Sequence, residues 1–184
     1  MKKYPLALLL CSSALMITLG SSTAWAQPNP PQVSDKAASS VTMGDKSWVQ
    51  NMYLGGLEEV RMGKLAVKKA TSRELRLFAQ SMVTRHTLVN QELKKLADKK
   101  GLALTPPGAL TDEYKTLSNL SGKKFDQKYL AVVVEDHKRI VAAFEKEAGK
   151  GGDPNLTSWA AKQLPTLKKH LSMSQNLQKK MGSQ

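Results

Sequence analysis

Cysteine and aromatic residues are scarce in this sequence of 184 residues. Its single cysteine, Cys11, lies in an apolar segment near the N-terminus, so the rest of the chain offers no disulfide, no thiol nucleophile and no thiolate metal ligand. Aromatic residues make up only 5% of the chain, which leaves little of the stacking surface that proteins binding single-stranded nucleic acid require. We therefore expect no nucleic-acid partner.

Recognised catalytic motifs are absent as well. The sequence contains no serine nucleophile elbow with a histidine and an acid in the required order, and no glycine-rich phosphate loop. It therefore predicts no catalytic residues and no binding site for an organic cofactor. This absence favours a binding or interaction protein over a dedicated enzyme.

Long apolar runs are missing beyond the N-terminus, where residues 1–26 combine the three parts of a secretory signal peptide. Lys2 and Lys3 give the positive start, residues 6–19 the apolar centre, and residues 24–26 (Ala-Trp-Ala) the cleavage site. The apolar run is shorter than the roughly 20 residues of a transmembrane helix, and no later run approaches that length. We therefore predict an exported mature protein with no transmembrane segment, located in the periplasm or peripherally at the outer membrane.

Negative charge is in deficit, since the formal net charge is +13, or +11 once Lys2 and Lys3 are removed. Basic pairs such as Lys94-Lys95 recur along the chain. The simpler interpretation is that they lie on solvated helix faces. The alternative is a basic envelope interaction or stress protein that associates with anionic envelope components, because a field of this sign attracts polyanions.

The exported part of the chain divides into a tether and one domain. Residues 27–44 are rich in Pro, Ser, Gln and Asn and lack hydrophobic periodicity, so they predict a disordered tether. Residues 45–184 are numerous enough to bury a core without disulfides. We therefore predict a single folded domain over that range.

The first half of the domain has the periodicity of a helical hairpin, with no strand alternation. The first helix is predicted at about residues 45–70. The capping-box pattern Thr71-Ser72-Arg73-Glu74 begins the second helix, which Gly101 ends. Two antiparallel helices joined by a tight turn follow from this pattern.

The second half repeats the plan after a longer connection. A short helix is predicted at about residues 112–120, a third long helix at about 125–148, and a fourth after Asp153-Pro154, an N-cap followed by proline in the first helical position. The sequence thus predicts an all-α four-helix bundle with a short extra helix in the connection between long helices 2 and 3. Whether that connection crosses the bundle is left open by the pattern.

The inward stripe of each long helix contains one ionisable residue at a 3,4 spacing. These residues are Glu59, His86, His137 and His170, and they include every histidine in the sequence. Each lies near the middle of its helix, so the four should meet at one level of the bundle. Asp136 lies on the row beside His137.

Buried ionisable groups require a partner, because burial of an unpaired charge costs free energy. Imidazole and carboxylate together commonly bind zinc, copper or iron. We therefore predict one divalent transition metal ion bound by Glu59, His86, Asp136, His137 and His170. The alternative is a hydrogen-bonded core network of the same residues with no ion.

A ferritin-type di-iron centre is not expected, because it requires Glu-x-x-His pairs. The residues three positions before the histidines are Val83, Val134 and Leu167. Methionines also lie close to the predicted site, at Met52, Met62, Met82 and Met173. Their thioethers would suit copper(I), although buried methionines more often serve as core filler.

Several short pieces match one protein family in combination. They are Gly56-Leu57-Glu58-Glu59-Val60, Phe78-Ala79-Gln80-Ser81-Met82-Val83, Glu135-Asp136-His137 and Leu164-Pro165-Thr166-Leu167 with His170-Leu171. With these pieces the sequence resembles the family called domain of unknown function 4142 over about residues 47–177. The resemblance implies an exported bacterial protein with a ferritin-like four-helix bundle. It implies no particular activity, since the family has none that is settled.

Overall fold

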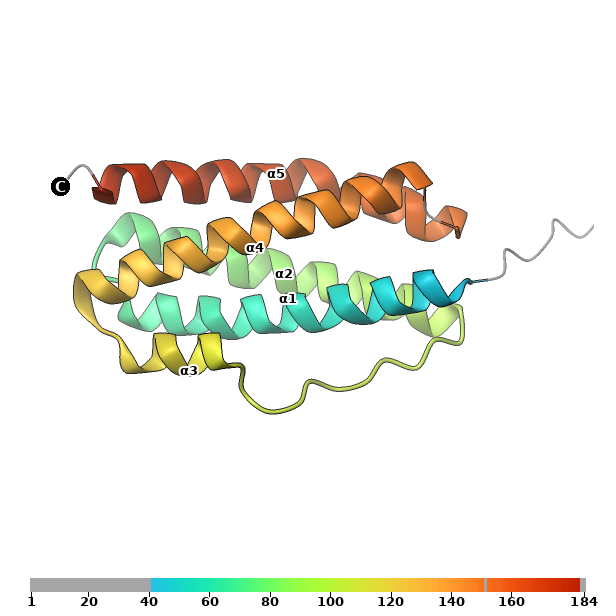
Figure 1. The fold of residues 1–184 in the computed structure, drawn as a ribbon, viewed down its shortest axis with the longest axis horizontal. Coiled ribbons are helices and arrows are strands. Elements are labelled where there is room, and N and C mark those ends of the chain that lie inside the picture. Colours follow the sequence, from blue (N-terminus) through green and yellow to red (C-terminus); the bar gives the residue numbers. More distant parts are fainter. Residues whose placement is uncertain (1–40, 151, 183–184) are drawn as a thin grey trace, which may run out of the picture. The chain divides into compact units, whose positions relative to one another are not determined.

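The computed structural model describes residues 41–150 and 152–182, which belong to the compact unit Ala38–Gln184. The predicted signal peptide, and the predicted tether as far as residue 40, lie outside the described residues. The described residues form helices and no strand (Figure 1). The helices are α1 (Met43–Lys69), α2 (Arg73–Lys99), α3 (Asp112–Asn119), α4 (Gly122–Lys150) and α5 (Pro154–Gly182).

Helix α1 begins at Met43, two residues before its predicted start. A capping box at Thr42 stabilises this N-terminus. The Thr42 hydroxyl accepts a hydrogen bond from the Asp45 N–H at 3.1 Å, and the Asp45 carboxylate accepts one from the Thr42 N–H at 2.8 Å. Two N–H groups that the helix itself cannot satisfy are thereby paired. The polar composition around Thr42 concealed this signal in the sequence.

The predicted capping box at Thr71 is wrong by one residue. Ser72 is the N-cap of α2, and its hydroxyl accepts a hydrogen bond from the Leu75 N–H at 3.1 Å. Thr71 instead donates its N–H and its hydroxyl to the carboxylate of Asp126 on α4. Because Asp126 is only 1% exposed, its need for donors decides the role of Thr71.

The second helical hairpin begins and ends close to the predicted positions. Helix α4 begins at Gly122, which has a φ of +57°, rather than at Phe125. The Asp153 carboxylate accepts hydrogen bonds from the N–H groups of Asn155 and Leu156 at 2.9 and 3.1 Å, so the predicted N-cap of α5 is confirmed. Helix α5 continues through Pro165.

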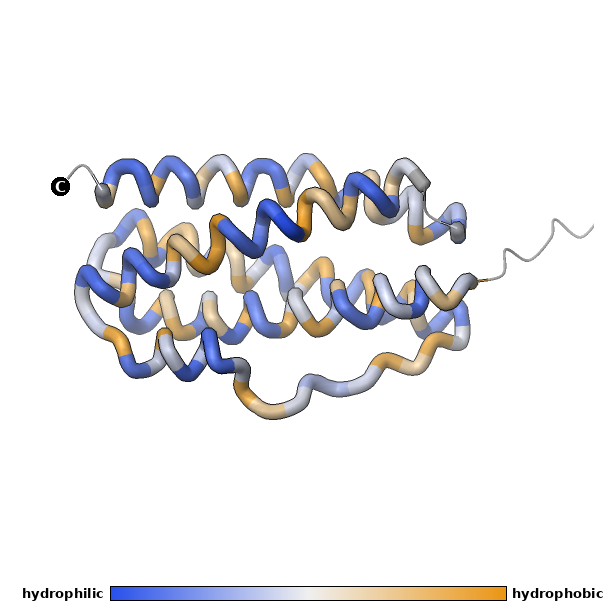
Figure 2. The backbone as a smooth tube through the Cα atoms, viewed as in Figure 1, coloured by the Kyte–Doolittle hydropathy of each residue, from blue (hydrophilic) through white to orange (hydrophobic). Residues whose placement is uncertain are grey.

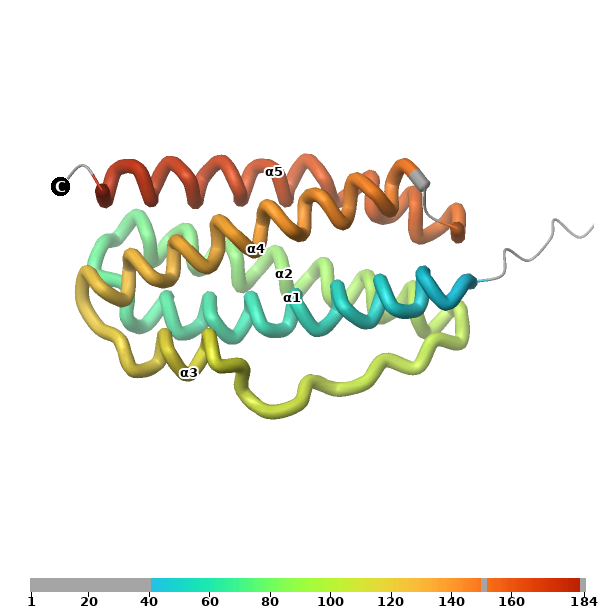
Figure 3. The backbone as a smooth tube through the Cα atoms, in the orientation of Figure 1, coloured from blue at the N-terminus to red at the C-terminus, as the bar shows by residue number. Residues whose placement is uncertain are grey.

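The connection from α2 to α4 runs the length of the bundle alongside α1 (Figures 1 and 3). Its contacts progress along α1 in order. Gln50 and Thr105 exchange two hydrogen bonds. Further along, the Thr111 hydroxyl donates to the Glu58 carboxylate. Near the end of α1, the Lys69 ammonium donates to the carbonyl of Leu120. Helices α2 and α4 consequently run parallel, which is the crossover arrangement of ferritin-like bundles.

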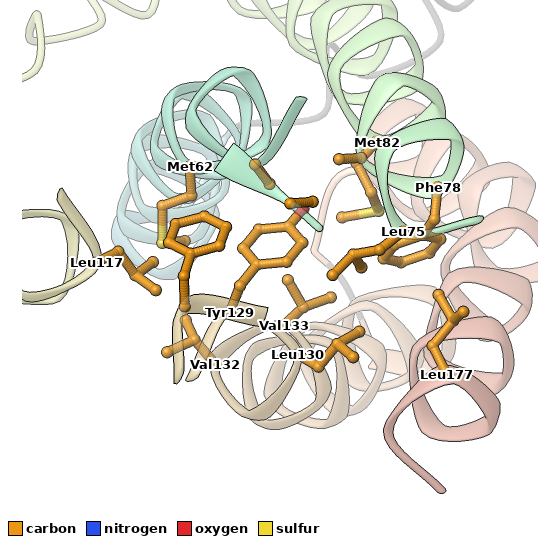
Figure 4. Packing of buried hydrophobic residues seen from close by; sticks show 14 residues of the cluster. Met62, Leu75, Phe78, Met82, Leu117, Tyr129, Leu130, Val132, Val133 and Leu177 are labelled. Atoms are coloured by element: carbon orange, nitrogen blue, oxygen red, sulfur yellow. The ribbon is translucent and has the colours of Figure 1, made fainter. Parts of the chain in front are cut away.

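Two hydrophobic regions of the core lie on either side of a polar layer. This layer consists of the buried side chains of Glu59, His86, His137 and His170. One contains Met62, Phe78 and Tyr129 (Figure 4). The other contains Phe144, packed edge to face on Trp48 with ring centroids 5.1 Å apart. Figure 2 shows apolar and polar stretches alternating along each long helix, as an amphipathic bundle requires. None of the described helices has the length and hydropathy needed to span a membrane.

Candidate metal centre

Each of the four long helices supplies one ionisable side chain to the polar layer. Glu59 comes from α1, His86 from α2, His137 from α4 and His170 from α5. Their exposed fractions are 4%, 4%, 0% and 4%, respectively. The predicted inward orientation of all four residues is therefore confirmed.

The three imidazole rings form a nearly equilateral triangle. Ring centroids lie 5.5 Å apart for His86 and His137, 5.4 Å for His86 and His170, and 5.5 Å for His137 and His170. One possible ligand atom from each histidine lies within 4.8 Å of those of the other two. Nε2 of His86, Nε2 of His137 and Nδ1 of His170 are buried and make no hydrogen bond. Three nitrogens from three helices are thus available to one ion.

Glu59 contacts the opposite edge of two of these rings. Its Oε2 lies 2.7 Å from His86 Nδ1, and its Oε1 lies 3.1 Å from His137 Nδ1. These are short ion-pair distances, although neither pair is aligned as a hydrogen bond. The backbone carbonyl of Val133 also lies 3.1 Å from His137 Nδ1. Contacts at Nδ1 leave Nε2 of both rings facing away from the carboxylate, as in metal sites whose histidines are oriented by a carboxylate or a carbonyl.

The electrostatics favour neutral imidazoles at His137 and His170 beside an ionised Glu59. Burial alone would raise the pKa of Glu59, but the nearby His86 and His137 outweigh it and hold that pKa below its ordinary value. Burial lowers the pKa of His137. Burial, together with repulsion from the other two histidines, lowers the pKa of His170 to about 3. His137 and His170 therefore keep a free lone pair near neutral pH, which is the form that binds metals.

Asp136 lies apart from the histidine triangle. Its carboxylate pairs with Arg139 one helical turn further along α4. Burial, and then repulsion from Glu59, raise its pKa to about 6. The structure therefore brings together four of the five residues that the sequence indicated, and it places Asp136 on a neighbouring face.

A groove of about 440 Å³ lies on that face, between α1, α4 and the crossover connection. Its wall includes Glu58, Glu59, Asp136 and, from the connection, Thr111 and Glu113. The sequence pattern did not indicate that the connection contributes to this wall. Helical periodicity says nothing about where a connecting segment lies, so no sequence signal could have supplied it.

Tyr129 was not among the predicted site residues, and its buried hydroxyl makes no hydrogen bond. Burial raises the pKa of Tyr129 well above its ordinary value, and the charge of Glu59 adds to the effect. Tyr129 falls on the row beside the predicted stripe of its helix, so only the structure identifies it. The neighbouring Met62 and Met82 are buried in the same hydrophobic cluster (Figure 4), which agrees with their expected use as core filler.

Solved structures share this fold. A DUF305 fragment from Deinococcus radiodurans superposes with a TM-score of 0.68 at 14% identity, covering 78% of this chain and 99% of its own. A DUF305 protein from Streptomyces coelicolor, described as a candidate secreted protein, gives a TM-score of 0.66 at 19% identity, covering 79% and 95%. At these identities the likeness concerns the fold alone. No curated protein matches the sequence.

The sequence resemblance is confirmed by a family model. The model described as domain of unknown function (DUF4142) matches residues 30–177, which include all four helices of the bundle up to Leu177 in α5. The family description names no ligand and no reaction, so the match establishes family membership and fold but no function. The chain belongs to the DUF4142 family.

Proposed function

We propose that this protein binds one divalent transition metal ion in the centre of the bundle, through His86, His137 and His170. The proposal rests chiefly on three buried imidazole rings that lie close together and that each have one nitrogen without a hydrogen-bond partner. Leaving a buried polar atom unpaired costs about 1–3 kcal/mol. An ion that accepts all three lone pairs removes that cost, whereas a hydrogen-bonded core network would have paired these atoms with one another or with neighbours.

Glu59 serves the proposed site as a positioning residue. Its carboxylate occupies the Nδ1 side of His86 and His137 and so directs their Nε2 atoms toward the ion. Its negative charge also offsets part of the charge of a divalent ion in a buried environment. Because the carboxylate lies outside the triangle, the ligands are three imidazole nitrogens. This donor set favours zinc or copper over iron, since iron would prefer an additional carboxylate ligand.

The test is thermal unfolding with Zn(II), Cu(II) or Fe(II), in the wild type and in a His86→Ala, His170→Ala double variant. A ligand at 100 times its Kd stabilises the folded state by about 2.7 kcal/mol if it binds that state alone. We therefore expect at least one metal to raise the Tm of the wild type by several degrees and to leave the double variant unchanged. The sequence has only three histidines, all in the triangle, so no other histidine can account for the effect.

A second variant separates metal binding from core packing. His170→Gln keeps a polar side chain of similar volume in the core and removes the imidazole donor. If neither variant differs from the wild type in its response to the metals, the histidines are core structure and the proposed function is wrong.

We further propose that the mature protein acts in the periplasm, on the basis of the signal-peptide pattern in residues 1–26. Its formal charge of +11 after cleavage also supports an alternative function, association with anionic envelope surfaces. That function requires vesicle binding that weakens steeply with salt and does not depend on the histidines. Salt-dependent binding in the absence of any metal response would favour it over the metal site.

A further inference from the structure

The groove beside Asp136 is acidic in a protein that is strongly basic. Four carboxylates line it, those of Glu58, Glu59, Glu113 and Asp136, against one basic side chain, that of Arg139. The whole chain has a formal charge of +13, a field that repels metal cations. A cleft lined by carboxylates focuses the opposite field and raises the local cation concentration. We call this feature the acidic groove.

The acidic groove leads toward the histidine triangle. A small cavity of about 30 Å³ lies deeper in the bundle and is lined by His86. Its wall shares Met52, Gly55, Glu59 and Ile140 with the wall of the acidic groove. Nε2 of His86 is buried and has no hydrogen-bond partner. A short partition that includes Glu59 therefore separates the groove from the cavity that His86 lines.

Gly55 is an unusual residue in that partition. Glycine inside a helix costs roughly 0.5–1 kcal/mol relative to alanine, so its presence requires a reason. Its neighbour Gly56 has one, since a Cβ there would lie 2.2 Å from Oδ1 of Asn90 on α2. A Cβ on Gly55 would meet nothing within 4 Å. Helix packing does not need Gly55, and a side chain at this position would lie in the partition between the groove and the cavity.

We propose that the acidic groove is the access route by which a divalent metal cation reaches the three-histidine site, passing Gly55 and Glu59. This inference rests on the proposed function. Glu58, Glu113 and Asp136 attract the hydrated cation, and Glu59 receives it beside the imidazole rings. Asp136, which the sequence grouped with the ligands, acts in this account on the route and not in the coordination sphere.

The test is the rate of Zn(II) uptake by the full-length chain, measured by stopped flow with a chromophoric zinc indicator as competitor. A Glu58→Gln, Glu113→Gln double variant removes two groove charges and keeps side-chain volume. Its matched control is Glu135→Gln, Glu145→Gln, which removes two charges from exposed side chains of α4 that pair with Lys138 and Lys168. We expect the groove variant to bind zinc about tenfold more slowly, the low end of electrostatic rate effects, and the control to retain the wild-type rate.

A Gly55→Leu variant tests the partition itself. Because its Cβ has free space, the helix can accommodate leucine, while the longer side chain obstructs the route. We expect uptake and release of zinc to slow by the same factor, with the equilibrium Kd unchanged. Wild-type rates in both the groove variant and Gly55→Leu would overturn the access route.

Failure of the access route is distinguishable from failure of the metal site. If the wild type loads zinc in a histidine-dependent way and only the rates are unaffected, the site stands and the route is wrong. If the wild type loads no more zinc at equilibrium than the His86→Ala, His170→Ala variant, both proposals are wrong.

Discussion

The chemistry of the polar layer depends on which nitrogen of each imidazole is engaged. Glu59 and the Val133 carbonyl contact the Nδ1 atoms, and the Nε2 atoms of His86 and His137 remain unpaired. Three rings with centroids 5.4–5.5 Å apart repel one another when protonated. Burial and this repulsion explain why the pKa values of His137 and His170 fall. Neutral imidazoles at His137 and His170 beside the negative charge of Glu59 are therefore favoured.

Glu147 is another buried carboxylate, and its Oε1 makes no hydrogen bond. It is 8% exposed, and its pKa is raised by burial and by repulsion from Asp45 and Asp153. When the pKa is higher in the folded state, the folded state binds more protons between the ordinary value of 4.5 and the raised one. The protein therefore loses stability as pH rises through that window.

We expect Glu147→Gln to raise the free energy of unfolding in urea at neutral pH. The gain should shrink toward zero below about pH 4, where the wild-type carboxyl is protonated in both states. Glu145→Gln is the matched control, since its side chain is 50% exposed in a surface pair with Lys168 and should change stability little. A gain that is equally large in acid would contradict the assigned cause.

At the scale of the helix, two glycines of α1 lie against side chains of α2 with no room for a Cβ. A Cβ on Gly56 would lie 2.2 Å from Asn90 Oδ1, and one on Gly63 would lie 2.8 Å from a methyl group of Val83. Asn90 is buried and donates to the carbonyl of Tyr53 at 3.2 Å, so it cannot move away without losing that hydrogen bond. The close approach brings Glu59, which lies between the two glycines in sequence, against His86 on α2.

Adjacent alanine substitutions should consequently act in opposite directions. Gly56→Ala creates a clash and should lower the free energy of unfolding by about 1–3 kcal/mol. Gly55→Ala meets no atom and should raise it by up to about 1 kcal/mol, through helix propensity alone. Urea unfolding of both variants is the measurement. A higher free energy of unfolding in Gly56→Ala would show that Gly56 is not a packing contact.

The helices were largely predictable because long amphipathic helices impose a period on the sequence that local signals seldom override. The exact residues at which the helices begin were harder to predict. The N-cap Thr42 lies in the polar stretch predicted as tether, and the demand of the buried Asp126 for donors shifted the α2 cap from Thr71 to Ser72. Cap geometry depends on tertiary partners, which the local pattern does not contain.

At the scale of the whole molecule, the crossover decides which helices are neighbours and places the acidic groove. The ionisable residues were predictable, since the stripe gives the face of each helix and its length gives the height of Glu59 and each histidine. The groove was not, because Thr111 and Glu113 reach it through the crossover connection. The ring nitrogen that faces the centre was likewise unpredictable, because it is set by contacts between helices.

The most direct test of the metal centre is the X-ray absorption spectrum of the full-length chain loaded with one equivalent of Zn(II). Zinc bound to imidazole nitrogen has bonds of about 2.0–2.1 Å. We expect a first shell at that distance, with outer-shell scattering from three imidazole rings that is lost in the His86→Ala, His170→Ala variant. A shell of oxygen ligands without imidazole scattering, unchanged in that variant, would contradict the three-histidine site.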